Sequence, residues 1–418
     1  MKKVLFLSFY WPPSGKASHH WPLKMVKYLP RHNWQPTILT VKEDTFTKSD
    51  LELLKEVDPE LKVIHTDFWD PFILYKKLLG KKEDQSLVAS ESISKINKSF
   101  AQKFSIWLRM NFFIPDARIG WYFPGLREAS KLLREERYDA IVSNGPPHST
   151  HLLAERLSRK FNIPLVSVFI DPWVDIAYYK GQQRSKITKY IDNSFERKII
   201  KNSNKLVFVT NSMKEYFYNK YPGTEEKSSV LHWGYNEEDF ENVEIVKNDG
   251  EVLLHAGNIF DFQNPVNLWR TVKREIENGR KLKIRFVGTV SPAVKKSIEE
   301  FGLSEYTEYK GYLPYKDVIK EVMSADYLLV CATEPRHTPG KLFEYLRARK
   351  PIIAFADNNR DVKRMIEESN SGMVFRYDEN PSSFFNNSNE LKCEKEITKK
   401  YERKNIAIKL AGILNNIK

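Results

Sequence analysis

A lysine and a glutamate stand three residues apart in the segment TPGKLFEYLRARKPII (338–353), which begins like a helix start and ends like a buried strand. Pro339 and Gly340 lead the predicted helix, so Lys341 and Glu344 lie on its opening turn. As a solvated ion pair they would contribute only about 0.2 to 0.5 kcal/mol. The alternative is a ligand site, in which Lys341 neutralises a diphosphate at the positive helix end and Glu344 accepts hydrogen bonds from ribose hydroxyls.

Two more loops in the second half of the chain follow predicted strands. In LLHAGNIF, Gly257 and Asn258 come directly after a strand, where bare backbone amides can approach a phosphate. In YKGYLPYKD, the stretch of Gly311, Tyr312 and Leu313 is suited to holding a planar base by backbone groups and apolar contacts. We expect these loops and the opening lysine turn to converge on one edge of a single sheet.

The first half of the chain carries polar residues in comparable places. The loop WPPSGKASHHWPLK leads into a helix, and its Gly15 and Lys16 can approach an anion at the helix N-terminus, although such turns also carry glycine for purely structural reasons. His148 in SNGPPHSTHLLAE and Asp171 in VFIDPW follow two successive strands. Because the carboxyl ends of parallel strands meet at one edge of a sheet, we expect His148 and Asp171 to face one pocket. Alternatively, His148 has a purely structural role.

The same kind of scaffold for these side chains is predicted in each half of the chain. Short β-branched or aromatic runs alternate with helix-like stretches, which is typical of buried parallel strands. The runs of the first half are KVLFLSFY, QPTILTV, LKVIHTD, YDAIVSN, PLVSVFID, NKLVFVTNS and SSVLHWGYN. Those of the second half are EVLLHAGN, LKIRFVGT, YTEYKGY, DYLLVCAT, KPIIAFAD and SGMVFRY. Each half therefore predicts a doubly wound α/β domain.

The length of 418 residues also predicts two domains. We place an N-terminal Rossmann-like domain at residues 1–242 and a C-terminal one at 243–390, separated by the polar stretch NEEDFENVEIVKNDG. Residues 391–418 predict a closing helix that packs across the first domain. Its apolar residues available for burial are Ile406, Ile408, Leu410 and Ile413.

Residues 45–120 fit the strand and helix alternation poorly. Within them, FWDPFILYKKLLGKK and FAQKFSIWLRMNFF interleave aromatic and aliphatic side chains with lysine and arginine. Such an amphipathic excursion either packs its apolar face on its own domain or binds an anionic membrane surface or lipid acceptor.

The overall charge and the cysteines limit the function classes. The formal net charge of +13 favours a polyanion: nucleic acid, an anionic membrane surface or a phosphorylated substrate. We expect no nucleic acid partner, because neither zinc-finger spacing nor an RNA-binding signature is present. Cys331 and Cys393 show neither disulfide nor zinc spacing. Since the apolar run at the start is too short for a secretion signal or a spanning helix, we expect a cytoplasmic protein that can lie at the inner face of the membrane.

As a set, the motifs resemble glycosyltransferase family 4. The nucleotide-binding half of that family is similar to PGKLFEYLRARKPIIAFAD, GYLPYKDVIKEVMSADYLLV and HAGNIF. A bacterial branch that makes cell-surface polysaccharide is similar to FYWPPSGKAS, IPDARIGWYFPGL, SNGPPHSTHLLAERL and VFIDPWVD. The resemblance runs from residue 1 to about residue 380.

This resemblance implies a GT-B fold, in which the second domain holds a nucleoside-diphosphate sugar and the first holds a glycan or lipid-linked acceptor. It implies retention of the anomeric configuration with no metal ion or other cofactor. On the acceptor side it points to His148 and Asp171 as the catalytic pair, with Gly15 and Lys16 in an acceptor or donor-phosphate loop. The implied donor-binding residues are Gly257, Asn258, Gly311, Tyr312, Leu313, Arg336, Thr338, Gly340, Lys341, Leu342 and Glu344.

Two positions depart from the family pattern. Members often carry a glutamate eight residues before the ribose-binding one, but here that position is Arg336, with Glu334 two residues earlier. Many also carry an arginine and a lysine after the first glycine turn, where this chain has Gln263 and Asn264. Lys341, with Arg336, would then stabilise more of the leaving diphosphate. Two other functions therefore stay open: a GT-B sugar-nucleotide epimerase that uses His148 and Asp171 as acid and base, and a catalytically silent polysaccharide-assembly partner.

Overall fold

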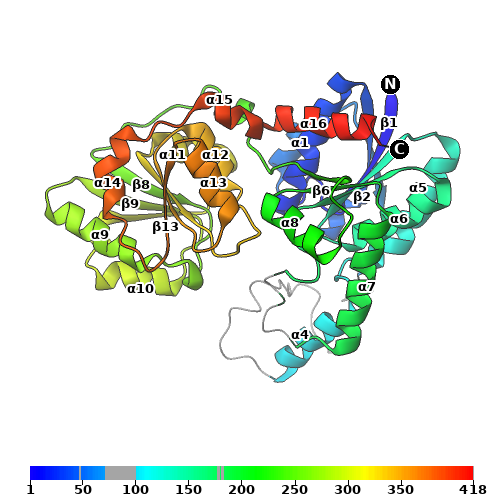
Figure 1. Cartoon of the computed structure of the whole chain (residues 1–418), viewed down its shortest axis with the longest axis horizontal. Coiled ribbons are helices and arrows are strands. Elements are labelled where there is room, and N and C mark those ends of the chain that lie inside the picture. The colour runs from blue at the N-terminus through cyan, green and yellow to red at the C-terminus, as the bar shows by residue number, and fades with distance from the viewer. Residues whose placement is uncertain (47–48, 71–99, 177–178, 180–182, 418) are drawn as a thin grey trace. The chain divides into compact units, whose positions relative to one another are not determined.

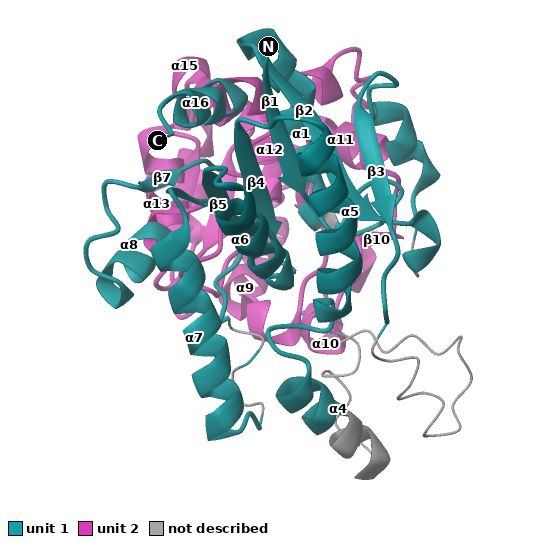
Figure 2. Cartoon of the chain, turned by 90° about the vertical axis from the view of Figure 1, so that its right-hand side faces the viewer, with its two compact units in different colours: residues 1–209, 214–231, 407–418 teal, residues 210–213, 232–406 magenta. Residues whose placement is uncertain are grey.

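The computed structural model describes residues 1–46, 49–70, 100–176, 179 and 183–417 and divides into two compact units (Figures 1 and 2). Unit 1 consists of residues 1–209, 214–231 and 407–418, and unit 2 of residues 210–213 and 232–406. Apart from the short segment 210–213, the chain passes into unit 2 at His232, a few residues before the polar stretch at which we predicted the domain boundary. It returns to unit 1 for its last residues.

Unit 1 contains a sheet of seven parallel strands in the order β3-β2-β1-β4-β5-β6-β7. Each strand falls in one of the apolar runs predicted for the first half of the chain. Their bounds are β1 Lys2–Leu7, β2 Trp34–Val41, β3 Lys62–Thr66, β4 Ala140–Gly145, β5 Leu165–Phe169, β6 Lys205–Phe208 and β7 Ser228–Val230.

Unit 2 contains a sheet of six parallel strands in the order β10-β9-β8-β11-β12-β13. Their bounds are β8 Glu251–Ala256, β9 Leu282–Val287, β10 Thr307–Gly311, β11 Tyr327–Cys331, β12 Ile352–Phe355 and β13 Gly372–Phe375. Both faces of this sheet are covered: Leu253 packs into one buried cluster, and its neighbours Val252 and Leu254 pack into another. Burial on both faces explains why the strands read as continuous apolar runs.

Helices flank each sheet (Figure 1). Those that follow the strands of the first half are α1 His20–Tyr28, α4 Phe100–Phe112, α5 Tyr122–Glu135, α6 Ser149–Phe161, α7 Lys186–Asn202 and α8 Asn211–Lys220. Those of the second half are α9 Val266–Glu277, α10 Pro292–Glu300, α11 Tyr315–Ser324, α12 Lys341–Ala348, α13 Arg360–Glu368, α14 Ser382–Asn387, α15 Lys395–Thr398 and α16 Arg403–Asn415. The predicted architecture of two doubly wound α/β domains is therefore confirmed.

The strand order reverses once in each sheet, between β1 and β4 in unit 1 and between β8 and β11 in unit 2. At such a point the loops leaving the two strands diverge to opposite faces and open a crevice at their carboxyl ends. In unit 1 these loops lead to Gly15 and His148. In unit 2 they lead to Gly257 and Lys341. The topology therefore places these four residues at the switch point of their own unit, whereas Asp171 follows β5 and Gly311 ends the edge strand β10.

The end of the chain packs on unit 1 through α16. Its buried residues follow the helical spacing of three and four: Ala407, Leu410, Ala411 and Leu414 belong to unit 1, whereas Ile406, one residue earlier, belongs to unit 2. We expected Ile408 to be buried as well, but it is 46% exposed because it lies on the opposite side of the helix from Leu410. Asn415 adds a hydrogen bond, since its Oδ1 accepts from Trp34 Nε1 at 3.1 Å.

The predicted excursion at residues 45–120 is described only in part. It contributes β3 to the edge of the sheet and the helix α4, which covers FAQKFSIWLRMNF. Most of FWDPFILYKKLLGKK lies outside the described residues. Within the part of the chain that is described, no helix is both long enough and apolar enough to span a bilayer.

The packing of α16 can be tested by truncating one buried and one exposed side chain. Leu410→Ala should lower the free energy of unfolding by about 2 to 5 kcal/mol, because it removes a fully buried side chain and leaves a cavity. Ile408→Ala, on the exposed side, should change it by about 0.5 kcal/mol or less. Denaturant unfolding followed by circular dichroism measures both. Equal effects of the two substitutions would contradict this packing.

Candidate functional site

Three glycines form the floor of the candidate site in unit 2. Gly257 follows β8, Gly288 follows β9 and Gly311 ends β10, and all three have positive φ angles, of 99°, 105° and 66°. A Cβ atom on Gly288 would lie 2.8 Å from the carbonyl carbon and oxygen of Gly257. The Gly288 amide donates to the carbonyl of Gly311 at 2.6 Å. Only glycine permits this close approach of neighbouring strand ends.

Lys341 extends from the start of α12 over this floor. A Cβ atom on Gly257 would lie 3.0 Å from the Lys341 ammonium and 3.2 Å from its Cε. The Nζ atom lies 3.0 Å from Nε2 of His255, which is buried near the end of β8. The structure thus brings together Lys341 and the Gly257 turn, as the sequence predicted.

The surroundings of Lys341 fix the charge state of both side chains. Burial lowers the pKa of Lys341 to about 8, so the amine is mainly protonated at neutral pH. Burial and the neighbouring Lys341 charge hold the pKa of His255 well below its ordinary value, so the imidazole is neutral. A neutral ring can accept a hydrogen bond at Nε2 when its proton is on Nδ1. His255 therefore accepts from the ammonium and orients it.

Glu344 lies one turn further along α12 and has a different partner. The Tyr315 hydroxyl, from the start of α11, donates to Glu344 Oε1 at 3.0 Å. Burial raises the pKa of Glu344 to about 7, and the nearby Arg403 opposes this rise. Because Lys341 contacts His255 and Glu344 contacts Tyr315, each is positioned separately. This arrangement supports two ligand contacts better than a surface ion pair.

The other predicted donor residues of unit 2 fall into two groups. Asn258 and Tyr312 are exposed, with Tyr312 at 84%, and the Asn258 Oδ1 accepts from the amide of Thr289 at 3.0 Å. Thr338 is buried, and its Oγ1 has no hydrogen-bond partner among the described residues. Leu342 is part of the apolar core, so its side chain anchors the helix.

Two further residues of this set pack against neighbouring groups. Leu313 is half-buried and packs against the same core cluster as the start of α12. Gly340 lies against an indole, because a Cβ atom there would be 3.1 Å from Trp233 Nε1. A side chain at position 340 would therefore displace Trp233 or the start of the helix.

Arg336 precedes this helix in a loop with its own supports. Its Nε donates to Glu334 Oε1 at 3.0 Å. Asn359 Nδ2 donates to the carbonyls of Glu334 and His337, both at 2.8 Å. The Arg336 guanidinium is therefore oriented by the carboxylate two residues earlier.

Gln263 and Asn264 stand where the resemblance led us to expect an arginine and a lysine, and both form hydrogen bonds within unit 2. Gln263 Nε2 donates to the carbonyl of Cys331 at 3.1 Å. Asn264 Nδ2 donates to Ser297 Oγ at 2.8 Å, and its Oδ1 accepts from Trp269 Nε1 at 2.7 Å. Their polar atoms hold the loop after β8 to its own domain, so they do not substitute for two charges at the glycine floor.

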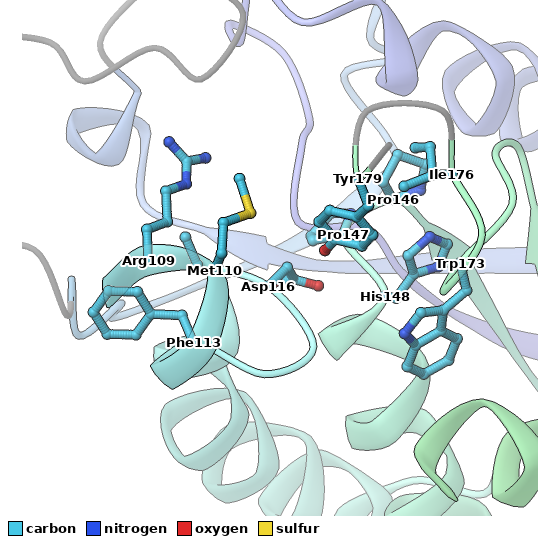
Figure 3. A pocket seen from close by; sticks show the side chains of 11 residues that line it. Arg109, Met110, Phe113, Asp116, Pro146, Pro147, His148, Trp173, Ile176 and Tyr179 are labelled. Carbon is cyan, nitrogen blue, oxygen red and sulfur yellow. The ribbon is translucent and has the colours of Figure 1, made fainter. Parts of the chain in front are cut away.

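Unit 1 has a pocket of about 180 Å³ beside the start of α6 (Figure 3). His148 is one of its walls and stacks on Trp173, with ring centroids 4.8 Å apart and planes 7° apart. Burial lowers the pKa of His148 to about 3, so the ring is neutral at physiological pH. A backbone hydrogen bond to the neighbouring Pro172 opposes this shift without cancelling it. The lining residues are Arg109, Met110, Phe113, Asp116, Ala117, Pro146, Pro147, His148, Trp173, Ile176 and Tyr179.

The carboxylate of this pocket is Asp116, which the sequence reasoning did not single out. It accepts hydrogen bonds from the amide and the hydroxyl of Ser149, both at 2.9 Å, and from the amide of Arg118 at 2.9 Å. It thereby caps α6 and fixes the loop that carries His148. Asp116 lies in the motif IPDARIGWYFPGL, but no local sequence pattern predicts its contact with Ser149, because the two residues are far apart in the sequence.

The remaining predicted residues of unit 1 lie elsewhere. Asp171 follows β5 and is half-buried, but it is not among the residues that line the pocket with His148. Gly15 and Lys16 are exposed in the loop between β1 and α1. The expectation that His148 and Asp171 share one pocket is therefore not confirmed, because only His148 lines this one.

Two sequence models of protein families match the chain. One is described as Glycosyltransferase Family 4 and matches residues 96–239, and the other is described as Glycosyl transferases group 1 and matches residues 236–407. Together they span most of the chain. No curated protein matches it by sequence.

Solved structures match nearly the whole chain. HepE of Anabaena, solved with UDP and glucose, has a TM-score of 0.64 and 12% identity, over 99% of this chain and 100% of that one. Sucrose-phosphate synthase of Thermosynechococcus elongatus has a TM-score of 0.63 and 12% identity, over 99% and 98%. TarM of S. aureus, solved with Fondaparinux, alpha-GlcNAc-glycerol and UDP, has a TM-score of 0.59 and 13% identity, over 100% of both chains. At these identities the similarity shows the fold.

The glycine floor can be tested with a matched pair of substitutions. Gly279 and Gly288 both have positive φ angles, but a Cβ atom on Gly279 meets nothing within 4 Å. Gly279→Ala should therefore cost about 1 to 2 kcal/mol, for the backbone conformation alone. Gly288→Ala should cost about 1 to 3 kcal/mol more, because its Cβ meets the Gly257 backbone. Denaturant unfolding compares them, and equal losses would refute the close approach.

Proposed function

This chain belongs to the family 4 glycosyltransferases with the GT-B fold, and we propose that it transfers a sugar from a nucleoside-diphosphate sugar to a hydroxyl of a glycan or lipid-linked acceptor. The observation that carries the proposal is the position of the Lys341 ammonium over the Gly257 turn, with Glu344 on the same helix. A cation and bare backbone amides suit a diphosphate, and a carboxylate suits two ribose hydroxyls.

In the proposed donor complex, Lys341 and the Gly257 turn bind the diphosphate and Glu344 binds the ribose. The stretch of residues 311–313 borders the base. We propose uridine as the base to test first, because HepE was solved with UDP and with UDP-glucose. The sugar is the least defined part, since Arg336 stands where many members have a glutamate and is itself paired with Glu334.

The proposed chemistry relies on stabilising the leaving group. Cleavage of the bond between the anomeric carbon and the diphosphate oxygen builds positive charge on the sugar and negative charge on the diphosphate. The fixed Lys341 ammonium and the backbone amides stabilise that negative charge. The acceptor hydroxyl attacks the same face of the sugar and gives its proton to the departing diphosphate. This route retains the anomeric configuration and requires neither a protein nucleophile nor a metal ion.

On the acceptor side, we propose that the neutral ring of His148, which lines the pocket, hydrogen-bonds to a substrate hydroxyl through one of its nitrogens. Asp171 would orient the acceptor from a neighbouring strand end. Gly15 and Lys16 would contribute an anion contact from their exposed loop. We further propose a role in bacterial surface polysaccharide synthesis, at the inner face of the membrane.

A screen of nucleotide sugars tests this function. We expect one donor to raise the melting temperature, and mass spectrometry with lipid-linked acceptors should then detect an added sugar with the anomeric configuration of the donor. If the donor is epimerised in the absence of an acceptor, the transferase proposal is wrong and the protein is an epimerase. If no nucleoside diphosphate or sugar nucleotide raises the melting temperature, the chain is instead a catalytically silent assembly partner. That alternative would agree with Gln263 and Asn264, whose side chains form hydrogen bonds inside unit 2 and supply no charge to a diphosphate.

The ribose contact predicts a selective loss of donor affinity. Glu344→Ala should weaken UDP binding by about tenfold or more, because a charged hydrogen bond contributes about 1.5 to 3 kcal/mol. Isothermal titration calorimetry measures the affinity. The control is Glu367→Ala, which removes an exposed carboxylate on α13. Unchanged affinity in the Glu344 variant would refute the ribose role.

The two shifted pKa values predict a narrow pH optimum for UDP affinity. As pH rises through about 8, Lys341 loses its charge, and as pH falls through about 7, Glu344 is protonated. Affinity should therefore be highest between these values and fall on both sides. In Lys341→Arg the alkaline decline should disappear, because a guanidinium stays charged. A flat profile of the unmodified protein from pH 6 to pH 9 would contradict both assignments.

A further inference from the structure

In unit 1 the end of α4 lies beside the start of α7 (Figure 1). Asn111, near the end of α4, connects them: its Oδ1 accepts from the amide of Ser185 at 2.6 Å and from the Thr188 hydroxyl at 3.0 Å. The Thr188 hydroxyl also lies 3.2 Å from the Asn111 carbonyl. The last turn of α4 and the first turn of α7 are thus one connected surface, which we name the α4–α7 tip and define as residues 107–112 and 185–190.

The α4–α7 tip presents large apolar side chains to solvent. Phe112 is 65% exposed, Ile187 73% and Tyr190 75%. Ile187 and Tyr190 are three residues apart, so they lie on one face of α7. Trp107 adds an aromatic ring whose centroid is 5.9 Å from that of Phe112. Two separate helices therefore contribute to one aromatic and aliphatic surface.

The charge of the tip is positive. Lys186 and Lys189 are exposed in the first turns of α7, which has no acidic residue in its first turn. A helix N-terminus carries partial positive charge, so lysines there reduce helix stability. The nearest carboxylate of α7, Asp192, is buried and holds Arg184 and the Trp173 indole. The outer surface therefore combines lysines, aromatic rings and an isoleucine, a composition typical of segments that bind anionic bilayer interfaces.

The tip is continuous with the pocket that contains His148. Arg109, Met110 and Phe113 of the same α4 region line that pocket (Figure 3). Phe112 directly precedes Phe113, which lines the pocket, so a lipid beside Phe112 would lie close to the pocket. An arginine at that place suits a phosphate.

We propose that the α4–α7 tip docks on an anionic lipid surface and thereby presents the head group of a lipid-linked acceptor to the pocket of unit 1. The second half of this statement rests on the proposed function, whereas the docking does not. A second copy of the chain is a poorer occupant, because two lysine-bearing tips would repel each other.

Co-sedimentation with vesicles of phosphatidylcholine, with and without phosphatidylglycerol, tests the docking without any donor or acceptor. The unmodified chain should bind more strongly when phosphatidylglycerol is present. Phe112→Ser, Ile187→Ser and Tyr190→Ser in one variant should lower the partition coefficient by about tenfold or more, since three apolar side chains no longer enter the interface. The matched control replaces three exposed apolar residues outside the tip by serine: Leu51, Ile245 and Ile408.

The charge contribution is tested separately. Lys186→Glu with Lys189→Glu should abolish the preference for phosphatidylglycerol, whereas Lys392→Glu with Lys395→Glu, which changes the net charge equally, should retain it. Undiminished vesicle binding by the tip variants would overturn the proposal. So would sedimentation velocity showing that the tip variants lose only self-association. Because the assay needs no sugar transfer, failure of the proposed enzymatic function would leave the docking result unaffected.

Discussion

The partly desolvated ammonium of Lys341 is the interaction on which the site of unit 2 depends. It lies over Gly257, whose positive φ and close approach to the lysine disfavour a Cβ atom, and the neutral ring of His255 accepts from it. The three residues come from different parts of unit 2: Gly257 follows β8, His255 lies within β8, and Lys341 begins α12. Removing charge from water has a free-energy cost, which a bound diphosphate would offset. The site is therefore preorganised for an anion.

The two candidate sites follow the same electrostatic pattern. Burial shifts Lys341 and Glu344 toward neutrality, and it keeps His148 neutral. Groups of this kind have little solvation to lose when a ligand arrives, so hydrogen bonds to the ligand become stronger in the low-dielectric site. Unit 1 stacks its histidine on an indole, whereas unit 2 pairs its lysine with an imidazole. Burial sets the charge state in both, and the aromatic neighbours position the side chains.

The fold could be predicted from the sequence because parallel strands buried on both faces appear as continuous apolar runs. The runs around β8 and β11 are examples, and their loops correctly located Gly257 and Lys341 at one switch point. The hydrogen bond from Tyr315 to Glu344 could not be predicted, because it joins two helix starts that only tertiary packing brings together. Asp116 was missed for the same reason. The burial assigned to Ile408 was wrong because apolar type alone does not define the buried side of a helix.

The return of the chain to unit 1 has a consequence for biosynthesis. Leu410 and Leu414 belong to the core of unit 1, but they follow all of unit 2 in the sequence. During translation the first sheet therefore emerges from the ribosome well before the helix that covers part of it. Until then, the apolar surface beneath α16 is open to chaperones and to aggregation. A helix that is synthesised after all of unit 2 thus completes unit 1.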